Sequence, residues 1–261
     1  MQSHCYMSLI KFLKLSYKYY KGSADTKPDI KEIFSFIHEL DKTRSKKIQM
    51  QWQRYPVAYK VYTGKSYLEN LKDNNFEENT FGHDLQQWFE EDNYDLFKES
   101  LDTVIIKNKL DAKFWEHHTF QHDVIHFLNN YDTSPIGEVM VLSFNLAKEW
   151  RWSYFAILFS SLFIALRNTF TKGGWKKIKY IPILVYIRLV IEGYKKGKKA
   201  EWLMAIDFEE LYGLPTADVK KLLNVKPSVY WEHIKPRWAK LHKHYKKFKE
   251  NNGATNTKTA S

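Results

Sequence analysis

The chain has 261 residues, 44% of them hydrophobic and 16% aromatic, and its 41 basic residues outnumber the 30 acidic ones to give a net charge of +11 at pH 7. This apolar content, with only 10 glycines and 7 prolines, excludes disorder over most of the length and argues against a many-turned β-sandwich. The single cysteine, Cys5, excludes a disulfide framework and a cysteine metal site, and it is compatible with a reducing compartment.

Residues 1–24 are predicted to form a basic amphipathic segment. Between Met7 and Tyr20, lysines are interleaved with apolar and aromatic residues, as in a helix that lies on a membrane surface. A terminal helix packed on the domain is the alternative. The segment has no arginine and no small-residue cleavage site, so we do not expect a signal or transit peptide.

Residues 25–246 are predicted to fold as one helical domain. Apolar residues recur at helical spacing from Ile30 to Leu40, from Leu85 to Phe89 and from Lys107 to Leu128. Strand signals are scarce, and the stretch from Val57 to Thr63, which could also be loop or helix, is the one region with plausible strand character. The expected fold class is therefore all-α, a single-domain helical bundle.

One short motif in this domain contains candidate metal ligands: His122-Asp123-x-x-His126, followed after eleven residues by Glu138. Residues four apart on a helix share a face, so His122 and His126 can aim their ring nitrogens at one point. Asp123 lies about 100° around the helix and could join the coordination sphere or orient a ligand from outside it. The four side chains can close on one divalent metal. Mixed nitrogen and oxygen donors favour zinc, with iron(II), manganese and magnesium as alternatives.

The segment between His126 and Glu138 predicts the turn of an α-hairpin. Its asparagines and aspartate favour non-helical backbone, and a hydroxyl side chain followed by proline is typical of a helix start. Glu138 then falls in the first turn of the second helix, where the helix dipole favours the ionised, metal-binding carboxylate. A chance histidine pair with ordinary polar contacts is the alternative. The residues that carry the turn signal are Asn129, Asn130, Asp132, Thr133 or Ser134, and Pro135.

The motif H-D-x-x-H-x11-E resembles the signature of the coenzyme Q biosynthesis protein 4 family, and looser matches in the same order extend the resemblance over about residues 75–226. These flanking matches are Asn79-Thr-Phe-Gly82, Gly193 to Ala200, Phe208-Glu-Glu, Pro215, and Leu222 to Val225. The chain departs from the family pattern at Phe208, at Lys220, and at His117 to Gln121, where charged residues commonly precede the motif.

The resemblance implies a helical, membrane-associated protein that binds isoprenoid compounds and acts in ubiquinone biosynthesis. Members of the family are held to remove the C1 carboxylate of a prenylated hydroxybenzoate ring and to introduce a hydroxyl there, so a metal-dependent carbon–carbon lyase is expected. The alternatives are a non-catalytic isoprenoid-binding scaffold and a relative that acts on another aromatic lipid or polyketide. The implied metal ligands are His122, Asp123, His126 and Glu138, with His122 and Glu138 as catalytic residues.

Just before the motif, His117 and His118 are predicted to lie on a solvated helix face, with an outer-sphere group or general base as the alternative. Three tryptophans near the motif, Trp115, Trp150 and Trp152, are predicted to be packing residues rather than part of a cofactor site.

Two apolar runs follow the hairpin. The run from Trp152 to Leu166 is too short to span a membrane and predicts a buried helix, with the wall of a lipid tunnel or a membrane-docking face as the alternative. The run from Ile181 to Ile191 is the second. Residues expected to accept a prenyl tail are Leu158, Phe159, Leu162 and Phe163. Candidates to bind an anionic head group, with structural ion pairing as the alternative, are Arg151, Arg167 and Arg188.

Towards the C-terminus, Gly213 to Pro215 marks a stop and Thr216 a new cap, Pro227 ends that short helix, and Ser228 opens a last one. The polar residues 247–261 are expected to form a disordered tail.

The predicted partners follow from charge and from the resemblance. Lysines cluster in residues 172–179, 195–199 and 240–249 without any nucleic-acid-binding signature, so we expect an anionic membrane surface and no nucleic acid. A prenylated aromatic or isoprenoid lipid, other quinone-biosynthesis proteins and a second copy in a homodimer are the further partners considered. The expected location is cytoplasmic and peripheral on the inner face of the cell membrane, or on the matrix side of the mitochondrial inner membrane in a eukaryote.

Overall fold

The computed structural model of the chain describes residue 41 and residues 44–91, 109–170 and 183–236. The predicted N-terminal segment, the predicted helix from Ile30 to Leu40 and the predicted tail lie outside the described residues.

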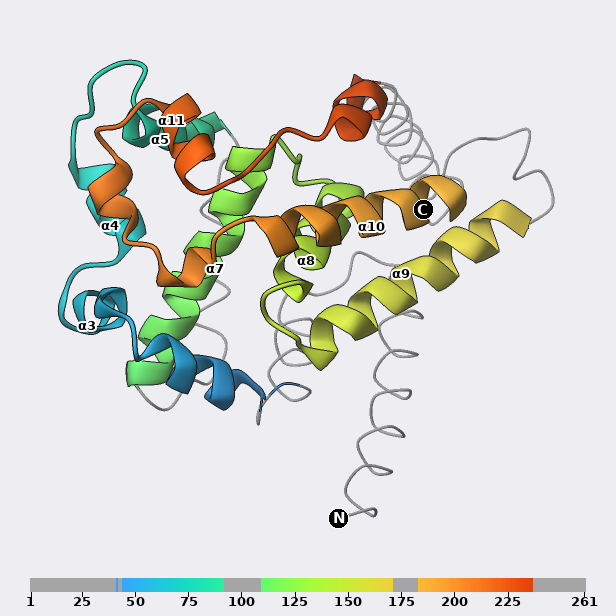
Figure 1. The fold of residues 1–261 in the computed structure, drawn as a ribbon, viewed down its shortest axis with the longest axis horizontal. Helices are drawn as coiled ribbons and strands as arrows, with labels where there is room; N and C mark the ends of the chain where they lie inside the picture. The colour runs from blue at the N-terminus through green and yellow to red at the C-terminus, as the bar shows by residue number, and fades with distance from the viewer. Residues whose placement is uncertain (1–40, 42–43, 92–108, 171–182, 237–261) are drawn as a thin grey trace, which may run out of the picture.

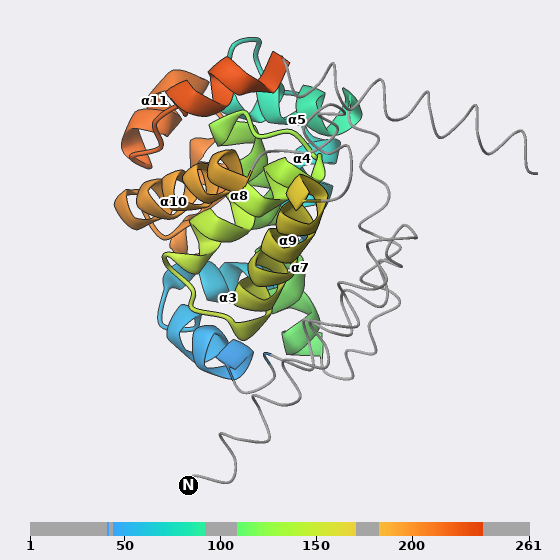
Figure 2. The same ribbon diagram turned by 90° about the vertical axis from the view of Figure 1, so that its right-hand side faces the viewer.

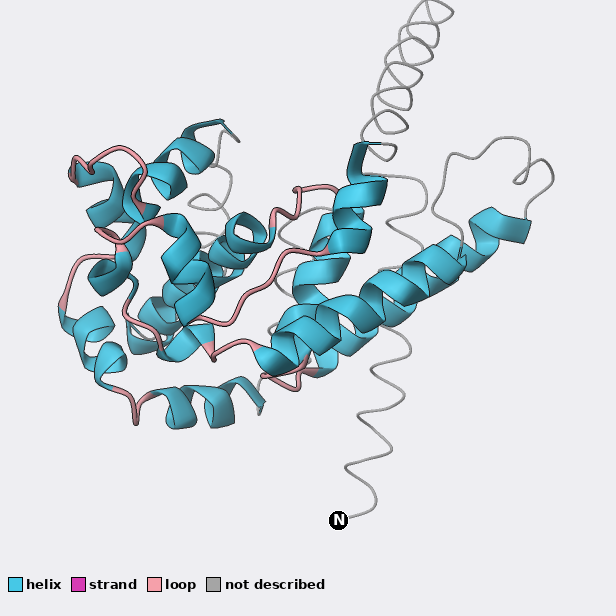
Figure 3. Cartoon of the chain, turned by 45° about the horizontal axis from the view of Figure 1, so that its top comes forward, coloured by secondary structure: helices cyan, strands magenta, loops and turns pink. Residues whose placement is uncertain are grey.

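Helices and short 3₁₀ turns form the described part of the chain, which contains no β-strand and one isolated bridge between Thr80 and Pro215 (Figure 3). The predicted all-α class is confirmed. Residues 44–52 are helical before α3, and residues 229–236 are helical after α11. The named elements are α3 (Pro56–Thr63), α4 (Tyr67–Asp73), α5 (Phe81–Glu91), α7 (Lys109–Asn129), α8 (Pro135–Leu146), α9 (Trp152–Phe170), α10 (Ile183–Lys199), η1 (Leu203–Ala205), η2 (Phe208–Leu211) and α11 (Thr216–Leu222).

The stretch with plausible strand character, Val57 to Thr63, is helical and belongs to α3. Pro56 opens the helix at its first turn, where the missing N–H of proline costs nothing. Val57 and Val61 lie one turn apart and are both buried. Apolar residues four apart on a short segment bury one helix face, which explains why a β-branched run is a helix here.

The helix α7 runs through the middle of the molecule, with α3, α4 and α5 on one side and α8 on the other (Figure 1). Aromatic contacts hold it there. Trp52 is fully buried, and its ring centroid lies 5.4 Å from that of Phe114 on α7. Tyr67 of α4 stacks on Phe120 of α7, also with 5.4 Å between ring centroids. The residues of the metal motif are therefore carried by a helix that is fixed on both sides.

The helices α8, α9 and α10 pack together in the other half of the molecule (Figures 1 and 2). Gly193 and Gly197 lie one turn apart on α10 and face α8. A Cβ on Gly193 would lie 2.8 Å from the carbonyl oxygen of Met140, and one on Gly197 would lie 2.0 Å from that of Phe144. The two glycines therefore permit a close backbone approach that no other residue allows.

The predicted apolar run after the hairpin is α9, which has 19 residues. Ala156, Ile157 and Leu158 are buried, whereas Phe155 is 38% exposed. Within the described residues, no helix combines the length and the apolar character needed to cross a membrane.

Candidate metal centre

The end of α7 is shaped by a left-handed asparagine. Asn130 has φ of 54°, and the N–H of Tyr131 donates to the carbonyl of His126 over 2.9 Å, which is the closing bond of a Schellman motif. After the turn, the Oγ of Ser134 accepts a hydrogen bond from the N–H of Gly137 and caps α8. The predicted α-hairpin and its serine cap are confirmed.

The start of α8 is fixed by close packing against the turn. A Cβ on Gly137 would lie 1.7 Å from the carbonyl oxygen of Asp132, so the glycine is required for this approach. Pro135 occupies the first turn, as predicted, and Asp132 accepts a hydrogen bond from the N–H of Ser134 over 3.2 Å. These contacts fix the backbone at Glu138, the residue after Gly137.

Three of the four predicted ligands converge on one point. The Nε2 of His122 lies 3.2 Å from Oε2 of Glu138 and 3.2 Å from Nε2 of His126. The Nε2 of His126 lies 3.3 Å from Oε1 of Glu138. One donor atom from each of the three side chains lies within 4.8 Å of the others, which is a geometry that could hold a metal ion.

The spacing of these atoms fits a divalent metal. In a tetrahedral site with bonds of about 2.0–2.1 Å, neighbouring ligand atoms lie about 3.3 Å apart, which is close to the separations of 3.2–3.3 Å found here. Two imidazoles and one carboxylate leave a position for water or substrate, as in catalytic zinc sites, and the same set suits non-haem iron(II). The donor set therefore fits a metal without selecting one.

The orientation of His126 is set by the main chain. Its side chain is fully buried, and its Nδ1 lies 3.4 Å from the carbonyl oxygen of Tyr131. Because a carbonyl can only accept, the Nδ1 carries a proton, and the Nε2 faces His122 and Glu138. A metal ion that binds here would replace the proton on Nε2.

The local charges keep the carboxylate ionised. Burial alone would raise the pKa of Glu138, but the charge of His126 and hydrogen bonds from both imidazoles outweigh burial and hold the pKa well below its ordinary value. Burial alone would likewise lower the pKa of His126, but the carboxylates of Glu138 and Asp123 outweigh it and raise that pKa. The site therefore presents an anionic ligand at neutral pH, which is the form that binds a cation.

The sequence left two roles open for Asp123. The residue is buried on α7, and its carboxylate is not among the three groups that converge. Its charge nevertheless acts on His126. This arrangement favours a role beside the ligands over a place among them.

One edge of the site is open. Glu138 keeps 39% of its side-chain surface exposed, whereas His122 keeps 14% and His126 none. Trp88 of α5 lies nearly parallel to the ring of His126, with 6.4 Å between centroids. A substrate would therefore approach at Glu138.

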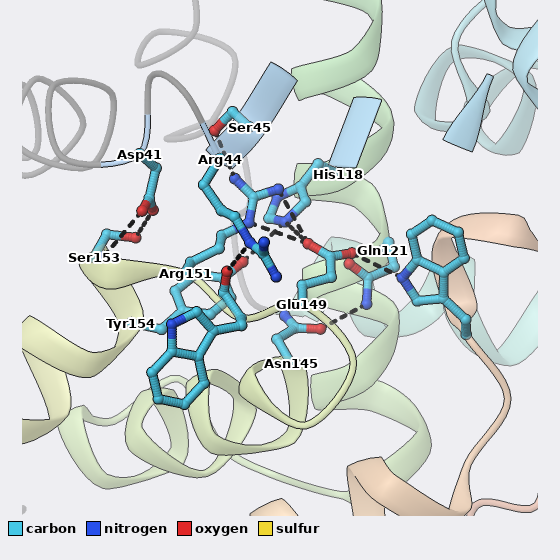
Figure 4. A network of polar contacts seen from close by, with 12 residues as sticks. Asp41, Arg44, Ser45, His118, Gln121, Asn145, Glu149, Arg151, Ser153 and Tyr154 are labelled. Atoms are coloured by element: carbon cyan, nitrogen blue, oxygen red, sulfur yellow. Dashed lines mark hydrogen bonds and ion pairs between the residues drawn. The ribbon is translucent and has the colours of Figure 1, made fainter. Parts of the chain in front are cut away.

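A second polar cluster lies one turn back along α7 (Figure 4). The Nε2 of His118 lies 3.2 Å from Oε2 of Glu149 and 2.9 Å from the hydroxyl of Tyr154. Arg151 donates to the same carboxylate oxygen through Nε and Nη2, at 3.1 and 3.0 Å. It also donates to Ser45 through Nη1, at 3.1 Å. All of these side chains are buried, so the cluster ties α7 to the start of α9 and to the helical residues 44–52.

The prediction that His117 and His118 lie on a solvated face is wrong, because α7 is enclosed by neighbouring helices over this turn. The two residues are only 1% and 6% exposed. The Nε2 of His117 faces the carbonyl of Met204 at 3.0 Å, and burial lowers its pKa to about 4. Burial and the charge of Arg151 also lower the pKa of His118.

Of the arginines considered for an anionic head group, Arg151 forms the structural ion pair that was the alternative. Burial alone would raise the pKa of Glu149, but Arg151 and His118 outweigh it and lower that pKa to about 2. Arg188 is exposed, and its guanidinium lies 3.8 Å from the centroid of the Tyr230 ring.

The side chains of Arg167 and Phe163 lie outside those that the structure describes. Among the other residues expected to accept a prenyl tail, Leu158 is buried, and Phe159 and Leu162 are partly buried.

The three tryptophans make packing contacts, as predicted, but at different depths. Trp115 is buried, whereas Trp150 and Trp152 are 43% and 49% exposed. These two contact each other edge to face, with 6.1 Å between ring centroids, where the loop enters α9 at the surface.

Sequence reasoning missed Trp88, Tyr131 and Glu149. Trp88 comes from a separate helix, and Tyr131 acts through its main-chain carbonyl, so neither carries a local signal. A signal did exist for Glu149, because His118 precedes His122 by one helical turn and a buried histidine on that face needs a polar partner.

The model of the coenzyme Q (ubiquinone) biosynthesis protein Coq4 family matches residues 60–228, which include His122, His126 and Glu138. Among solved structures, the chain is similar to the crystal structure of a presumed ubiquinone biosynthesis protein from Nostoc punctiforme PCC 73102. The two share 15% identity with a TM-score of 0.55, over 83% of this chain and 95% of that chain, and a likeness at this identity shows the fold alone. No curated protein matches the sequence.

Proposed function

Because this chain belongs to the coenzyme Q (ubiquinone) biosynthesis protein Coq4 family, we propose that it removes the C1 carboxylate of a prenylated hydroxybenzoate ring and introduces a hydroxyl group at that carbon. The observation that supports this proposal is the convergence of His122, His126 and Glu138 at a partly open edge. A buried site closed on all sides would suit a structural metal. An open position suits a substrate.

When bound, a divalent metal would act as a Lewis acid towards the substrate carboxylate or phenolate and stabilise the charge that develops on the ring as CO₂ leaves. Exchange of a carboxylate for a hydroxyl removes two electrons from the substrate, so the reaction also consumes an oxidant, for which we propose dioxygen.

We assign a role to each residue of the site from its position. Glu138 and His122 are the two groups with exposed surface at the open edge, so they are the proposed catalytic residues. His126 is fully buried and fixed through the carbonyl of Tyr131, so it holds the geometry. Trp88 stacks beside the ring of His126 and helps to hold it in place.

Zinc is the metal we propose first, from the mixture of nitrogen and oxygen donors. Zinc has no redox chemistry, whereas two histidines and a carboxylate are also the ligands of iron(II) oxygenases. Iron(II), manganese and magnesium therefore stay in the proposal as alternatives. Elemental analysis of the purified protein distinguishes them.

The proposed setting is an anionic membrane surface, on the cytoplasmic side of the cell membrane or on the matrix side of the mitochondrial inner membrane. Two observations support it: the net charge of +11, and membership of a family named for the synthesis of a lipid-soluble quinone. Other quinone-biosynthesis proteins and a second copy of the chain are proposed as partners.

The test uses Glu138→Ala, with Glu210→Ala as an exposed acidic control that lies outside the converging group. The metal-loaded proteins are given a prenylated hydroxybenzoate and dioxygen, and loss of CO₂ and gain of the ring hydroxyl are followed by mass spectrometry. We expect turnover in the wild type and in the control, and none in Glu138→Ala. Turnover by a well-folded Glu138→Ala protein would overturn the proposal.

The same experiment separates the alternatives. Wild-type protein that retains isoprenoid lipid, loses thermal stability on chelation and shows no turnover with any supplied ring would support a non-catalytic scaffold. Turnover of a different aromatic lipid would support a relative with another substrate.

A further inference from the structure

One face of α10 exposes a row of large apolar side chains. Leu184 is 77% exposed, Ile187 40%, Ile191 48% and Tyr194 42%. At about 100° of rotation per residue, these four side chains fall within an arc of roughly 80°. We call them the α10 apolar row. A single exposed apolar side chain needs no explanation, but four along one side of a helix form an apolar face that has no partner among the described residues.

A basic strip runs beside the row. Arg188, Lys195 and Lys199 are exposed, and the same rotation places them on the adjoining arc of roughly 40°. A fourth exposed cation, Lys198, follows the row at its C-terminal end. The exposed face of α10 is thus apolar along one side and cationic along the other, which is the pattern of a helix that lies in a membrane interface.

The exposed face of α10, made of the row and the strip together, lies on the far side of the helix from the metal hairpin. Gly193 and Gly197 press the opposite face of α10 against α8, the helix that carries Glu138 (Figure 2). Packed helix axes lie about 8–10 Å apart. A surface that contacts the row is therefore separated from the metal-bearing hairpin by a single helix.

We propose that the α10 apolar row is the docking surface of this protein for a bilayer that contains anionic lipids. The four apolar side chains enter the interface between head groups and acyl chains, and the basic strip contacts lipid phosphates. The inference rests on the proposed function for its claim that substrate comes from this bilayer, and its test needs neither metal nor turnover.

The basic strip favours a bilayer over a second copy of the chain. Lysine is depleted at the centres of protein interfaces, where each charge would lose water without gaining a partner. Anionic head groups offer phosphates to every cation along the helix and still leave them hydrated. The excess of basic residues in the whole chain also favours an anionic bilayer over a second, equally basic copy.

A site-specific probe tests the proposal on the full-length chain. The sole cysteine is removed by Cys5→Ser, and Ile187→Cys is labelled with an environment-sensitive fluorophore; Val229→Cys, at a residue 85% exposed on another helix, is the control. Vesicles of phosphatidylcholine with phosphatidylglycerol are added. We expect emission from position 187 to shift to shorter wavelength and to be quenched by lipid-borne quenchers, with no change at position 229.

A paired partition measurement uses unlabelled protein. Leu184→Gln with Ile191→Gln should weaken co-sedimentation with these vesicles roughly tenfold or more, because the exposed apolar surface is lost without any core contact. Lys195→Glu with Lys199→Glu should weaken it to a similar extent on anionic vesicles. The control pair Leu222→Gln and Val229→Gln removes exposed apolar surface elsewhere and should leave partition unchanged.

Three results would overturn the proposal. The first is protein that sediments with vesicles while emission from position 187 stays unchanged. The second is an emission shift that depends on protein concentration without vesicles, which would assign the row to a contact between copies. The third is an absence of any sedimentation with anionic vesicles. Because metal-free protein is used throughout, none of these results bears on whether Glu138 is needed for turnover.

Discussion

Gly197 of α10 lies so close to Phe144 of α8 that a Cβ on the glycine would sit 2.0 Å from the carbonyl oxygen of the phenylalanine. Backbone atoms cannot move aside as a flexible side chain can, so Gly197→Ala must push α10 away from α8. We expect this variant to lose roughly 1–3 kcal/mol of unfolding free energy, measured by urea denaturation.

The matched control is Gly213→Ala, because a Cβ there would have no atom within 4 Å. Its unfolding free energy should stay within about 0.5 kcal/mol of wild type. Equal effects of the two substitutions would show that the close approach of α8 and α10 does not limit stability.

The second prediction concerns the buried pair of Arg151 and Glu149. Arg151→Met keeps most of the volume but leaves the carboxylate of Glu149 buried without its main partner. We expect a loss of roughly 3–5 kcal/mol in unfolding free energy. Lys221→Met is the control, because Lys221 pairs with Asp218 at the surface, where an ion pair contributes under about 1 kcal/mol.

The double variant Arg151→Met with Glu149→Leu completes the cycle. Because Glu149→Leu removes the carboxylate that Arg151→Met leaves unpaired, part of the lost unfolding free energy should return. The view that the cost lies in the unpaired charge would be contradicted if the double variant lost more unfolding free energy than the losses of Arg151→Met and Glu149→Leu added together.

The third prediction is a pH dependence of stability that arises from His117. The pKa of this residue is lowered from 6.5 to about 4 by burial. His117 therefore binds a proton near pH 6.5 in the unfolded chain, but only near pH 4 in the folded chain. Stability from this group is present above pH 6.5 and is lost as the pH falls towards 4, by roughly 3 kcal/mol.

Replacement by Gln keeps a hydrogen-bond donor for the carbonyl of Met204 and removes the titration. His117→Gln should therefore show a shallower loss of stability between pH 6.5 and 4 than the wild type, in urea titrations at several pH values. His233→Gln changes an exposed histidine and should keep the wild-type slope. An unchanged slope in His117→Gln would assign the acid sensitivity to other groups.

The parts of the site that could be predicted are those whose information is local. The left-handed Asn130, the cap at Ser134, the proline at the start of α8 and the spacing of the two histidines all act within one turn of the chain, so they specify the hairpin and bring Glu138 to the imidazoles. Local signals of this kind need no knowledge of the rest of the fold.

The parts that could not be predicted depend on tertiary packing. Whether His118 faces water or the core is decided by how α3, α4 and α8 enclose α7, and nothing near His118 in the sequence encodes this. Val57 and Val61 likewise read as a strand until the helical face that they bury is known. A β-branched run has a preference for strands of only a fraction of a kcal/mol, which packing easily outweighs.

The last prediction decides the role of Asp123. A side chain that acts beside the ligands, through the charge and orientation of His126, should on loss of its charge weaken metal binding roughly 10–100-fold and leave one site per chain. Competition with a chelator of known zinc affinity measures this for Asp123→Asn. Glu138→Gln, which removes a converging ligand, should cost more than Asp123→Asn, and the exposed Asp218→Asn should cost nothing. If Asp123→Asn lost as much zinc affinity as Glu138→Gln, Asp123 would be a fourth ligand, and the open position would have to come from a higher coordination number.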